Sequence, residues 1–246
     1  MEKSALITGS TKGIGKAIAL KLLSKDYFVF LNYAHDDASA EALKKELDEK
    51  GFVGKYQIVK ADVSTEEGTG VLKESVLGKG LPLYYLVLNA ASNGTERNSF
   101  KNITRAEMAK MFEINLFSPF FLVQSFADSL AEGGAVLFIS SAMGIYPHST
   151  YIPYGTTKAA EIFLAKSLVK EFAEQKVRVN AIAPHCIETE MFPGNRGEEQ
   201  LSRMKASLAV GEFGKAEDVA DLALTVLENQ HMNGAVIKID GGYDYK

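Results

Sequence analysis

The sequence predicts one α/β domain, a doubly wound parallel sheet of about seven strands with helices on both faces. Short apolar segments alternate with longer segments of helical periodicity along the 246 residues, and this alternation is typical of parallel sheets covered by helices. A glycine-rich loop follows the first apolar segment and leads directly into a helical pattern. No run of proline, serine or charge marks a linker, so we assign residues 1–246 to a single domain.

The predicted elements follow one another in a regular order. The strand pattern covers residues 4–8, 27–33, 56–60, 83–88, 135–139, 177–183 and 235–239. The helical pattern covers residues 16–23, 38–50, 64–77, 105–130, 152–174 and 217–228, and Pro119 is expected to bend the fourth of these helices. Residues 184–208 form a long connection, and we expect a substrate lid at about residues 188–210. Its apolar side chains fit a lid or, equally, a small satellite core: Met191, Phe192, Met204 and Leu208.

The composition limits the kind of protein. Hydrophobic residues make up 46% of the chain, which is enough for a sizeable core, and the net charge is -4. This charge argues against nucleic acid or an anionic membrane as the main partner. Cys186 is the single cysteine, so no intrachain disulfide forms, as in a reducing compartment. No signal peptide or membrane-spanning run is present, and we expect a soluble cytoplasmic protein without a metal site.

The loop after the first strand has the residues of a phosphate cradle. Its glycines let the backbone turn tightly and approach a pyrophosphate, and the helix behind it offers unpaired N–H groups. A plain turn between a strand and a helix is the alternative. We predict a dinucleotide site that includes Gly9, Thr11, Lys12, Gly13, Ile14 and Gly15.

The end of the second strand bears on the choice of cofactor. Dinucleotide folds contact the adenosine ribose here, and Tyr33 and Ala34 provide no acid that would repel a 2′-phosphate. Lys12 could pair with that phosphate, or it could simply be solvated. Asp36 and Asp37 follow closely and argue the other way. On balance we expect NADP(H) to be preferred over NAD(H).

Polar and small residues follow the later strands. Asp62 is expected either to bind the adenine amino group or to cap the next helix. Asn89, Ala90 and Ala91 let a cofactor lie against the end of the fourth strand, and Ser141 and Pro184 follow the fifth and sixth strands. Since parallel strands end at one edge of a sheet, these residues should converge there.

Tyr154 and Lys158 form the most informative pair in the chain. They are four residues apart at the start of a predicted helix, which brings both side chains to one face. A nearby ammonium favours the phenolate, so the pair can exchange a proton with a substrate oxygen. Tyr56 and Lys60 have the same spacing, but they lie in a predicted strand and are a chance match.

Together these motifs resemble the short-chain dehydrogenase/reductase family over essentially the whole chain. The glycine loop reads Thr8-Gly9-x-x-x-Gly13-x-Gly15, and Asn115, Ser141, Tyr154 and Lys158 match the catalytic residues in order and spacing. The resemblance implies a Rossmann-type fold and an NAD(P)-dependent oxidoreductase acting on CH–OH or C=O groups. It extends the cofactor site to Tyr33, Asp62, Val63, Asn89, Ala90, Ala91, Tyr154, Lys158, Pro184, Ile187 and Thr189.

The resemblance also implies a role for each catalytic residue. Tyr154 would donate a proton to the carbonyl oxygen that receives a hydride from NADPH at its carbon. Ser141 would hydrogen-bond that oxygen. Lys158 would favour the phenolate and bind the nicotinamide ribose. Asn115 would order a water that leads protons to Lys158.

Within the family the chain most resembles 3-oxoacyl-acyl-carrier-protein reductases, in length and in its Asp240-Gly241-Gly242 end. Lys170 and Lys176 are basic residues suited to an acyl carrier protein, although residues 125–134 have none. The chain departs from the family pattern at Ala91, where a tighter cofactor fit is expected, and at His185. The expected substrate pocket contains Ser141, Met143, Tyr146, Tyr151, His185, Met191 and Phe192.

Other readings of the sequence stay open. A trans-2-enoyl reductase is the nearest enzyme alternative, because Tyr151 precedes Lys158 at that group's wider spacing. The substrate could also be a sugar, a steroid or another small ketone. A non-catalytic NADP(H)-binding sensor is the alternative outside the enzymes. The resemblance further implies a homotetramer or homodimer, formed through the helices that carry Asn115 and Tyr154.

Overall fold

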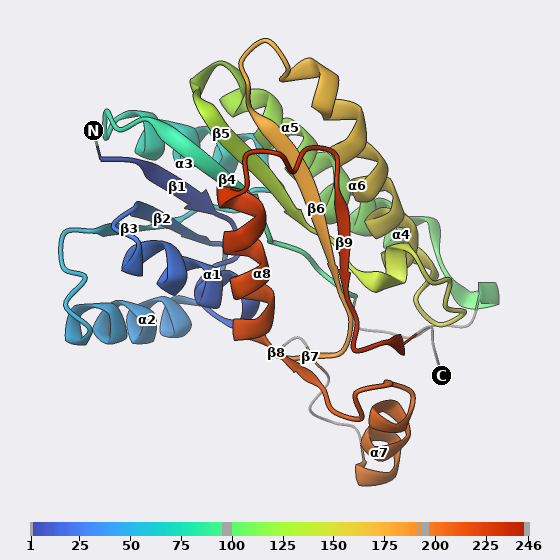
Figure 1. The fold of residues 1–246 in the computed structure, drawn as a ribbon. Coiled ribbons are helices and arrows are strands. Elements are labelled where there is room, and N and C mark those ends of the chain that lie inside the picture. The colour runs from blue at the N-terminus through green and yellow to red at the C-terminus, as the bar shows by residue number, and fades with distance from the viewer. Residues whose placement is uncertain (1, 95–99, 191, 193–196, 244–246) are drawn as a thin grey trace.

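The computed structural model describes residues 2–94, 100–190, 192 and 197–243. Its centre is a parallel sheet of seven strands in the order β3-β2-β1-β4-β5-β6-β9 (Figure 1). The predicted Rossmann-type fold is therefore confirmed. The strands are β1 (Ser4–Ile7), β2 (Phe28–Tyr33), β3 (Tyr56–Lys60), β4 (Leu83–Leu88), β5 (Leu130–Ile139), β6 (Arg178–Pro184) and β9 (Val236–Ile239).

Helices cover both faces of this sheet. Strand side chains alternate between the two faces with a period of two residues, so β1 sends Ala5 and Ile7 to one core and Leu6 to the other. The first core is closed by α1 (Gly13–Ser24), α2 (Asp37–Glu49) and α8 (Ala216–Glu228). The second core is closed by α3 (Glu66–Leu77), α5 (Ser118–Phe126) and α6 (Ile152–Glu171).

The strand order places a ligand crevice at one edge. The chain runs outward from β1 to β3 and then returns to add β4 on the other side of β1. Helices leave the carboxyl ends of β1 and β4 toward opposite faces, and open sheets of this type bind ligands at that point. The glycine loop follows β1 directly, so the fold brings it to this crevice.

The predicted helix over residues 105–130 is interrupted. The structure has α4 (Arg105–Phe112), a π-helical turn at Glu113–Phe117 that contains Asn115, and then α5. Pro119 lies in the first turn of α5, so the interruption of the predicted helix falls directly before the proline. The last predicted residue of this helix, Leu130, instead begins β5.

The long connection after β6 has secondary structure of its own. It contains β7 (Ile187–Glu188), which pairs with β8 (Gly214–Lys215), and the helix α7 (Glu198–Ala206). Figure 1 shows α7 apart from the layered body of the domain, and none of its residues is buried. Leu208, just after α7, is buried and lies next to Gly241 of the C-terminal segment. Met191 lies outside the described residues.

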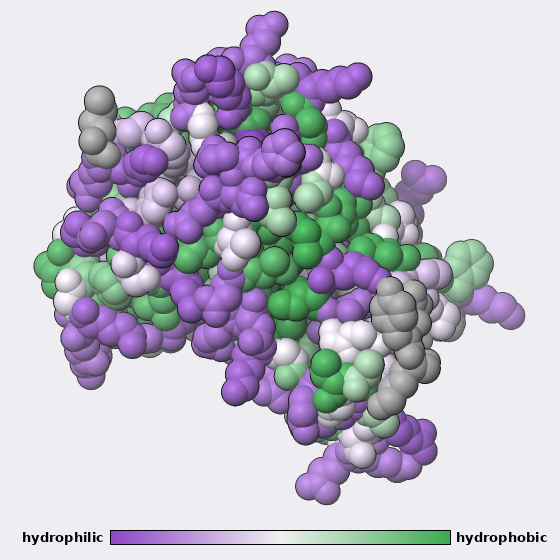
Figure 2. All heavy atoms as spheres, in the orientation of Figure 1, coloured by the Kyte–Doolittle hydropathy of each residue, from purple (hydrophilic) through white to green (hydrophobic). Residues whose placement is uncertain are grey.

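The surface is not uniformly polar. Figure 2 shows hydrophilic side chains over the outer helices and an apolar region around the edge strand β9. Exposed phenylalanines also occur at the π-helical turn and on α5 and α6: Phe117, Phe120, Phe121 and Phe163. Within the described chain, no helix has the length and apolar character that crossing a membrane requires.

Candidate active site

Two adjoining cavities open at the carboxyl edge of the sheet. One, here called the glycine-loop cavity, has a volume of ≈ 580 Å³ and lies over the ends of β1 to β4. The other, here called the α7 cavity, has a volume of ≈ 600 Å³ and is bordered by β6, α6 and α7. The residues that line both cavities are Ile14, Ser140, Tyr154 and Thr189.

Most of the predicted cofactor residues meet in the glycine-loop cavity. Its wall includes Gly9, Thr11, Lys12, Gly13, Ile14, Tyr33, Asp62, Val63, Asn89, Ala90, Ala91, Tyr154, Lys158 and Thr189. Pro184 and Ile187 line the α7 cavity instead. Gly15 lies beneath the loop, where a Cβ atom would come within 2.6 Å of the Gly9 carbonyl oxygen and of Asn89 Nδ2.

The glycine loop has the shape that a dinucleotide phosphate needs. Gly9 has φ +59°, and a Cβ atom there would lie 2.9 Å from Ala90 Cα, so only glycine fits this close approach. The N-cap of α1, Lys12, makes no side-chain capping bond, and the first turn of α1 has no acid. The first N–H groups of α1 are therefore suited to an anion. The residues present fit the pyrophosphate of NAD(P).

The loop is fixed to the neighbouring strand end. Asn89 Nδ2 donates to the carbonyl oxygens of Thr8 at 3.0 Å and of Gly9 at 2.8 Å. The hydroxyl oxygen of Thr8 accepts from the backbone N–H groups of Asn89 and Ala90, each at 3.0 Å. These bonds hold the loop before any ligand arrives.

At the adenosine end, Lys12 contacts Asp36 at 2.8 Å. Asp36 also caps α2 by accepting from the Ser39 N–H, and these bonds hold the pKa of Asp36 far below its ordinary value. Asp37 accepts from the Tyr33 hydroxyl and pairs with Lys60. Lys12 is thus paired with Asp36. Asp36 and Asp37 are each bound by further groups, Asp36 by Ser39 and Asp37 by Tyr33 and Lys60.

Asp62 lies in the wall of the same cavity, but it does not cap the following helix. The N-cap of α3 is Thr65, whose hydroxyl oxygen accepts from Gly68 N–H. Asp62 Oδ1 accepts from the backbone N–H and the hydroxyl of Ser64 at 3.0 and 2.7 Å. Burial raises its pKa, but the bonds from Ser64 outweigh burial and leave the pKa lowered. The capping interpretation is therefore wrong.

Tyr154 and Ser141 face the α7 cavity together. Tyr154 lies in the first turns of α6 and Ser141 follows β5. The Ser141 oxygen accepts from the Met143 N–H at 3.1 Å, which leaves the hydroxyl proton for another oxygen. The other predicted substrate residues in this wall are Met143, Tyr151, His185 and Phe192.

Tyr146 does not line the α7 cavity. Its hydroxyl donates to Asp240 Oδ2 at 3.0 Å and accepts from Lys238, and its ring lies 5.5 Å from that of Tyr243. Tyr243, which the sequence analysis missed, does line the cavity, and its ring centroid is 4.2 Å from that of His185. Burial lowers the pKa of His185. The C-terminal segment thus contributes to the substrate side.

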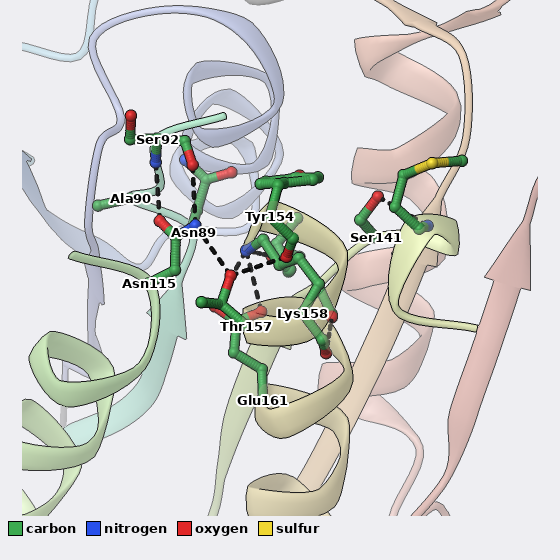
Figure 3. A network of polar contacts seen from close by, with 12 residues as sticks. Asn89, Ala90, Ser92, Asn115, Ser141, Tyr154, Thr157, Lys158 and Glu161 are labelled. Atoms are coloured by element: carbon green, nitrogen blue, oxygen red, sulfur yellow. Dashed lines mark hydrogen bonds and ion pairs between the residues drawn. The ribbon is translucent and has the colours of Figure 1, made fainter. Parts of the chain in front are cut away.

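Lys158 is almost fully buried behind Tyr154. Its Nζ donates to the Ile139 carbonyl oxygen at 3.1 Å and to both carboxylate oxygens of Glu161 at 3.0 and 2.9 Å (Figure 3). Burial works to lower the pKa of Lys158, but the charges of Glu161 and Tyr154 outweigh it and raise the pKa. For Glu161, burial outweighs the attraction of Lys158 and raises the pKa to about 7.

Asn115 occupies the π-helical turn with its side chain fully engaged. Its Oδ1 accepts from the Ser92 N–H at 2.8 Å, and its Nδ2 donates to the Ser92 carbonyl oxygen at 2.8 Å and to Thr157 Oγ1 at 3.2 Å (Figure 3). Met111 Sδ is a further contact at 3.1 Å. Both polar atoms of this buried amide are therefore hydrogen-bonded, and the side chain joins the segment after β4 to α6.

Comparison with known proteins agrees with this geometry. The family model for short chain dehydrogenases matches residues 3–200. Glucose 1-dehydrogenase 2 from Bacillus subtilis is 31% identical over 245 residues, covering 98% of this chain and 94% of that protein. A 3-oxoacyl-acyl-carrier-protein reductase from Staphylococcus aureus is 31% identical over 246 residues, covering 98% of both chains.

A solved structure shows the same arrangement of elements. A short chain dehydrogenase from Burkholderia cenocepacia in complex with NADP has a TM-score of 0.90 at 26% identity, covering 98% of both chains. The family match includes the glycine loop, Ser141, Tyr154 and Lys158. The chain therefore belongs to the short-chain dehydrogenase/reductase family and is an NAD(P)-dependent oxidoreductase acting on CH–OH or C=O groups.

Proposed function

We propose that this protein is an NADP(H)-dependent carbonyl reductase whose substrates are 3-oxoacyl thioesters. The observation that carries the proposal is the position of Tyr154, which lines both the glycine-loop cavity and the α7 cavity. A group at this junction reaches a cofactor in one cavity and a carbonyl in the other. Proton donors must lie within hydrogen-bond reach of the reacting oxygen.

Each residue near the junction has a role in this proposal. The bound cofactor supplies a hydride to the carbonyl carbon. Tyr154 donates its phenolic proton to the carbonyl oxygen, and the Ser141 hydroxyl donates a hydrogen bond to the same oxygen. Lys158 holds the nicotinamide ribose and places its ammonium 5.8 Å from the centroid of the Tyr154 ring. A water held beside Asn115 brings protons to Lys158, while the Asn115 side chain itself is engaged by Ser92 and Thr157.

The preference for NADP(H) rests on the adenosine end of the glycine-loop cavity. Tyr33 ends β2, so the residue that closes this strand has no carboxylate to repel a 2′-phosphate or to bind a ribose diol. Asp36, which also lines this cavity, is paired with Lys12. Lys12 and His35 line the cavity, and Asp36 is bound by the Ser39 N–H. We infer that Lys12 leaves Asp36 and pairs with the 2′-phosphate. The relative from Burkholderia cenocepacia, which was solved with NADP, supports this choice.

The α7 cavity suits an acyl chain. Met143, Ile187, Phe192 and Met204 provide apolar wall, and α7 borders the opening. We propose that α7 and the segments next to it make up the expected substrate lid at about residues 188–210. The similarity to the 3-oxoacyl-acyl-carrier-protein reductase supports the thioester, with an acyl carrier protein as the donor.

A sugar is the second candidate substrate, and a specific observation favours it. Gln200, Arg203 and His148 also line the α7 cavity and offer hydrogen bonds to hydroxyl groups. The glucose dehydrogenase from Bacillus subtilis is as similar to this chain as the thioester reductase is. The polar side chains of the α7 cavity thus suit a sugar, and its apolar side chains suit an acyl thioester.

The exposed phenylalanines support a homotetramer or homodimer. Phe117 is 44% exposed, Phe120 40%, Phe121 53% and Phe163 73%, and all lie on or next to α5 and α6. Large apolar side chains that gather on neighbouring helices mark interaction surfaces. A second copy of this chain is the occupant that we propose. Sedimentation should show an oligomer, and Phe121→Asp together with Phe163→Asp should shift it toward monomer.

A steady-state assay with a panel of substrates tests the proposed reaction. NADPH oxidation is measured with acetoacetyl thioester and crotonyl thioester, and NADP⁺ reduction with glucose. We expect turnover of the acetoacetyl thioester. Turnover of crotonyl thioester alone would make this an enoyl reductase, and turnover of glucose alone would support the sugar. Tight NADPH binding without any turnover would indicate a sensor.

A further inference from the structure

Glu161 is a buried carboxylate to which the proposed reaction gives no role. It lies on α6 three residues after Lys158, and only 3% of its surface is exposed. A carboxylate so far from water is costly unless it is paired. Its partner is the ammonium of Lys158, which contacts both of its oxygens at 3.0 and 2.9 Å. The Glu161 carboxylate is therefore separated from the proposed reaction site only by the Lys158 side chain.

Contacts with the end of β5 fix this pair in place. Lys158 Nζ also donates to the Ile139 carbonyl oxygen at 3.1 Å, and the Ser140 hydroxyl donates to the Lys158 carbonyl oxygen at 2.9 Å. The Lys158 ammonium is the main group that stabilises the charged form of Glu161. Together these contacts hold the ammonium 5.8 Å from the centroid of the Tyr154 ring.

The charge of the pair matters at this position. Lys158 lines the glycine-loop cavity, and an unpaired ammonium there would present a full positive charge to any ligand. With Glu161 ionised, the pair has no net charge. In a site shielded from water, an uncompensated unit charge several ångströms away is enough to change the binding constant of a charged ligand severalfold.

We propose that Glu161 is a positioning residue of this active site. Its carboxylate holds the Lys158 side chain in place and offsets its charge, so the cofactor meets a nearly neutral pair instead of an uncompensated ammonium. The inference rests on the proposed function, because it takes the cavity beside Lys158 to receive the nicotinamide end of NADP(H).

The inference predicts a specific effect on cofactor binding. The nicotinamide ring is positively charged in NADP⁺ and neutral in NADPH. Loss of the carboxylate leaves the ammonium uncompensated, which repels the oxidised ring and barely affects the reduced one. The ratio of the dissociation constants, NADP⁺ over NADPH, should therefore rise by about fivefold in Glu161→Gln.

The experiment measures both dissociation constants at pH 8.5, above the pKa of about 7 for Glu161. NADPH binding is followed by fluorescence and NADP⁺ binding by calorimetry. Glu161→Gln keeps the shape and removes the charge, and Glu161→Asp keeps the charge and shortens the side chain. Glu171→Gln is the matched control, because Glu171 is exposed at the end of the same helix. We expect the ratio to rise only in Glu161→Gln.

A ratio that stays within twofold of the wild-type value in folded Glu161→Gln would overturn the inference. If Glu161→Gln does not fold, the double variant Lys158→Met/Glu161→Leu decides, since an apolar pair often replaces a buried ion pair at little cost in stability. If the Lys158–Glu161 pair is neutral in the wild type, its replacement by apolar side chains should leave the ratio of the NADP⁺ and NADPH dissociation constants unchanged. A fall of about fivefold would show that Lys158 acts as an uncompensated charge and would overturn the inference. A wild-type chain that binds neither nucleotide would reject the proposed function instead.

Discussion

The two cavities of this molecule are built in different ways. The glycine-loop cavity is made from strand ends and the loop after β1, and hydrogen bonds among Thr8, Gly9 and Asn89 fix it to the sheet. The α7 cavity is made partly from the end of β5, the loop before α6 and the start of α6, and partly from the connection after β6 and the C-terminal segment. The helix α7 in that connection has no buried residue. The proposed cofactor side is thus fixed by the sheet, whereas part of the proposed substrate side has few anchors.

This difference explains why the reaction is easier to identify than the substrate. Cofactor binding and proton transfer need a small number of residues at set positions of the sheet, and those positions follow from the fold. The substrate side can change with its loop while the fold stays the same. The two relatives with 31% identity illustrate this, because one is a glucose dehydrogenase and the other a 3-oxoacyl thioester reductase.

The largest effect should come from a methyl group added at a glycine beneath the glycine-loop cavity, compared with a methyl group added at a glycine next to α7. Gly15→Ala places a Cβ atom 2.6 Å from the Gly9 carbonyl oxygen, and it should lower the free energy of unfolding by about 3 kcal/mol and weaken NADPH binding. Gly197→Ala, next to α7, meets no described residue within 4 Å and should change neither quantity. Urea unfolding and fluorescence titration measure both. Equal effects at the two glycines would remove the contrast between the cavities.

The buried pair on the cofactor side should give stability a pH dependence. Burial raises the pKa of Glu161 to about 7 from an ordinary value of 4.5, so the folded chain binds this proton more tightly than the unfolded chain. The resulting contribution to stability is complete below about pH 4.5 and is lost as the pH rises through about 7. Relative to Glu161→Gln, the wild type should lose about 2 kcal/mol between pH 5 and 8.

Urea unfolding of both chains at the two pH values measures this change, with Glu171→Gln as the control. Lys158 and Ser140 are the groups that act on the carboxylate, and neither titrates in this range. A difference between wild type and Glu161→Gln that is the same at pH 5 and pH 8 would mean that Glu161 keeps its ordinary pKa.

A smaller effect is expected at the adenosine end. Lys12→Ala removes the proposed partner of the 2′-phosphate, so the dissociation constant of NADPH should rise about tenfold while that of NADH stays within twofold. Lys16→Ala is the control, since Lys16 pairs with Glu46 and does not line the cavity. If NADPH and NADH lose affinity equally, the 2′-phosphate has another partner.

The smallest effect should come from the substrate side. The Phe192 ring packs 4.8 Å from that of Phe213 in the wall of the α7 cavity. Phe192→Ala should raise KM for acetoacetyl thioester by about fivefold and leave kcat and NADPH affinity within twofold, because it removes apolar contact only. Phe163→Ala, on the exposed face of α6, should leave KM unchanged. A loss of kcat in Phe192→Ala would place this residue closer to the chemistry.

The sequence predicted what depends on local pattern. The strands follow from apolar runs, and the pairing of Tyr154 with Lys158 follows from helical spacing within one turn. Glu161 was missed although it lies on the same helix face, because charged residues are rarely buried and its burial depends on contacts with β5. Its spacing of three residues from Lys158 was the available indication.

Other features depend on contacts that the sequence does not express. The Lys12–Asp36 pair joins residues 24 positions apart, and neither residue type fixes that partner in advance. The π-helical turn at Glu113–Phe117 has no marker residue of its own. The helix α7 has two large apolar side chains, Leu201 and Met204, so the apolar stripe by which helices are usually found is short.

A single-turnover experiment tests the central claim most directly. NADPH oxidation by acetoacetyl thioester is measured in Tyr154→Phe and in the matched variant Tyr151→Phe, which removes the hydroxyl of the neighbouring tyrosine in the α7 cavity. The account predicts that Tyr154→Phe loses at least about a thousandfold in rate and retains NADPH binding within a few-fold, whereas Tyr151→Phe stays within about fivefold of wild type. Loss of turnover in Tyr151→Phe with retention in Tyr154→Phe would contradict it.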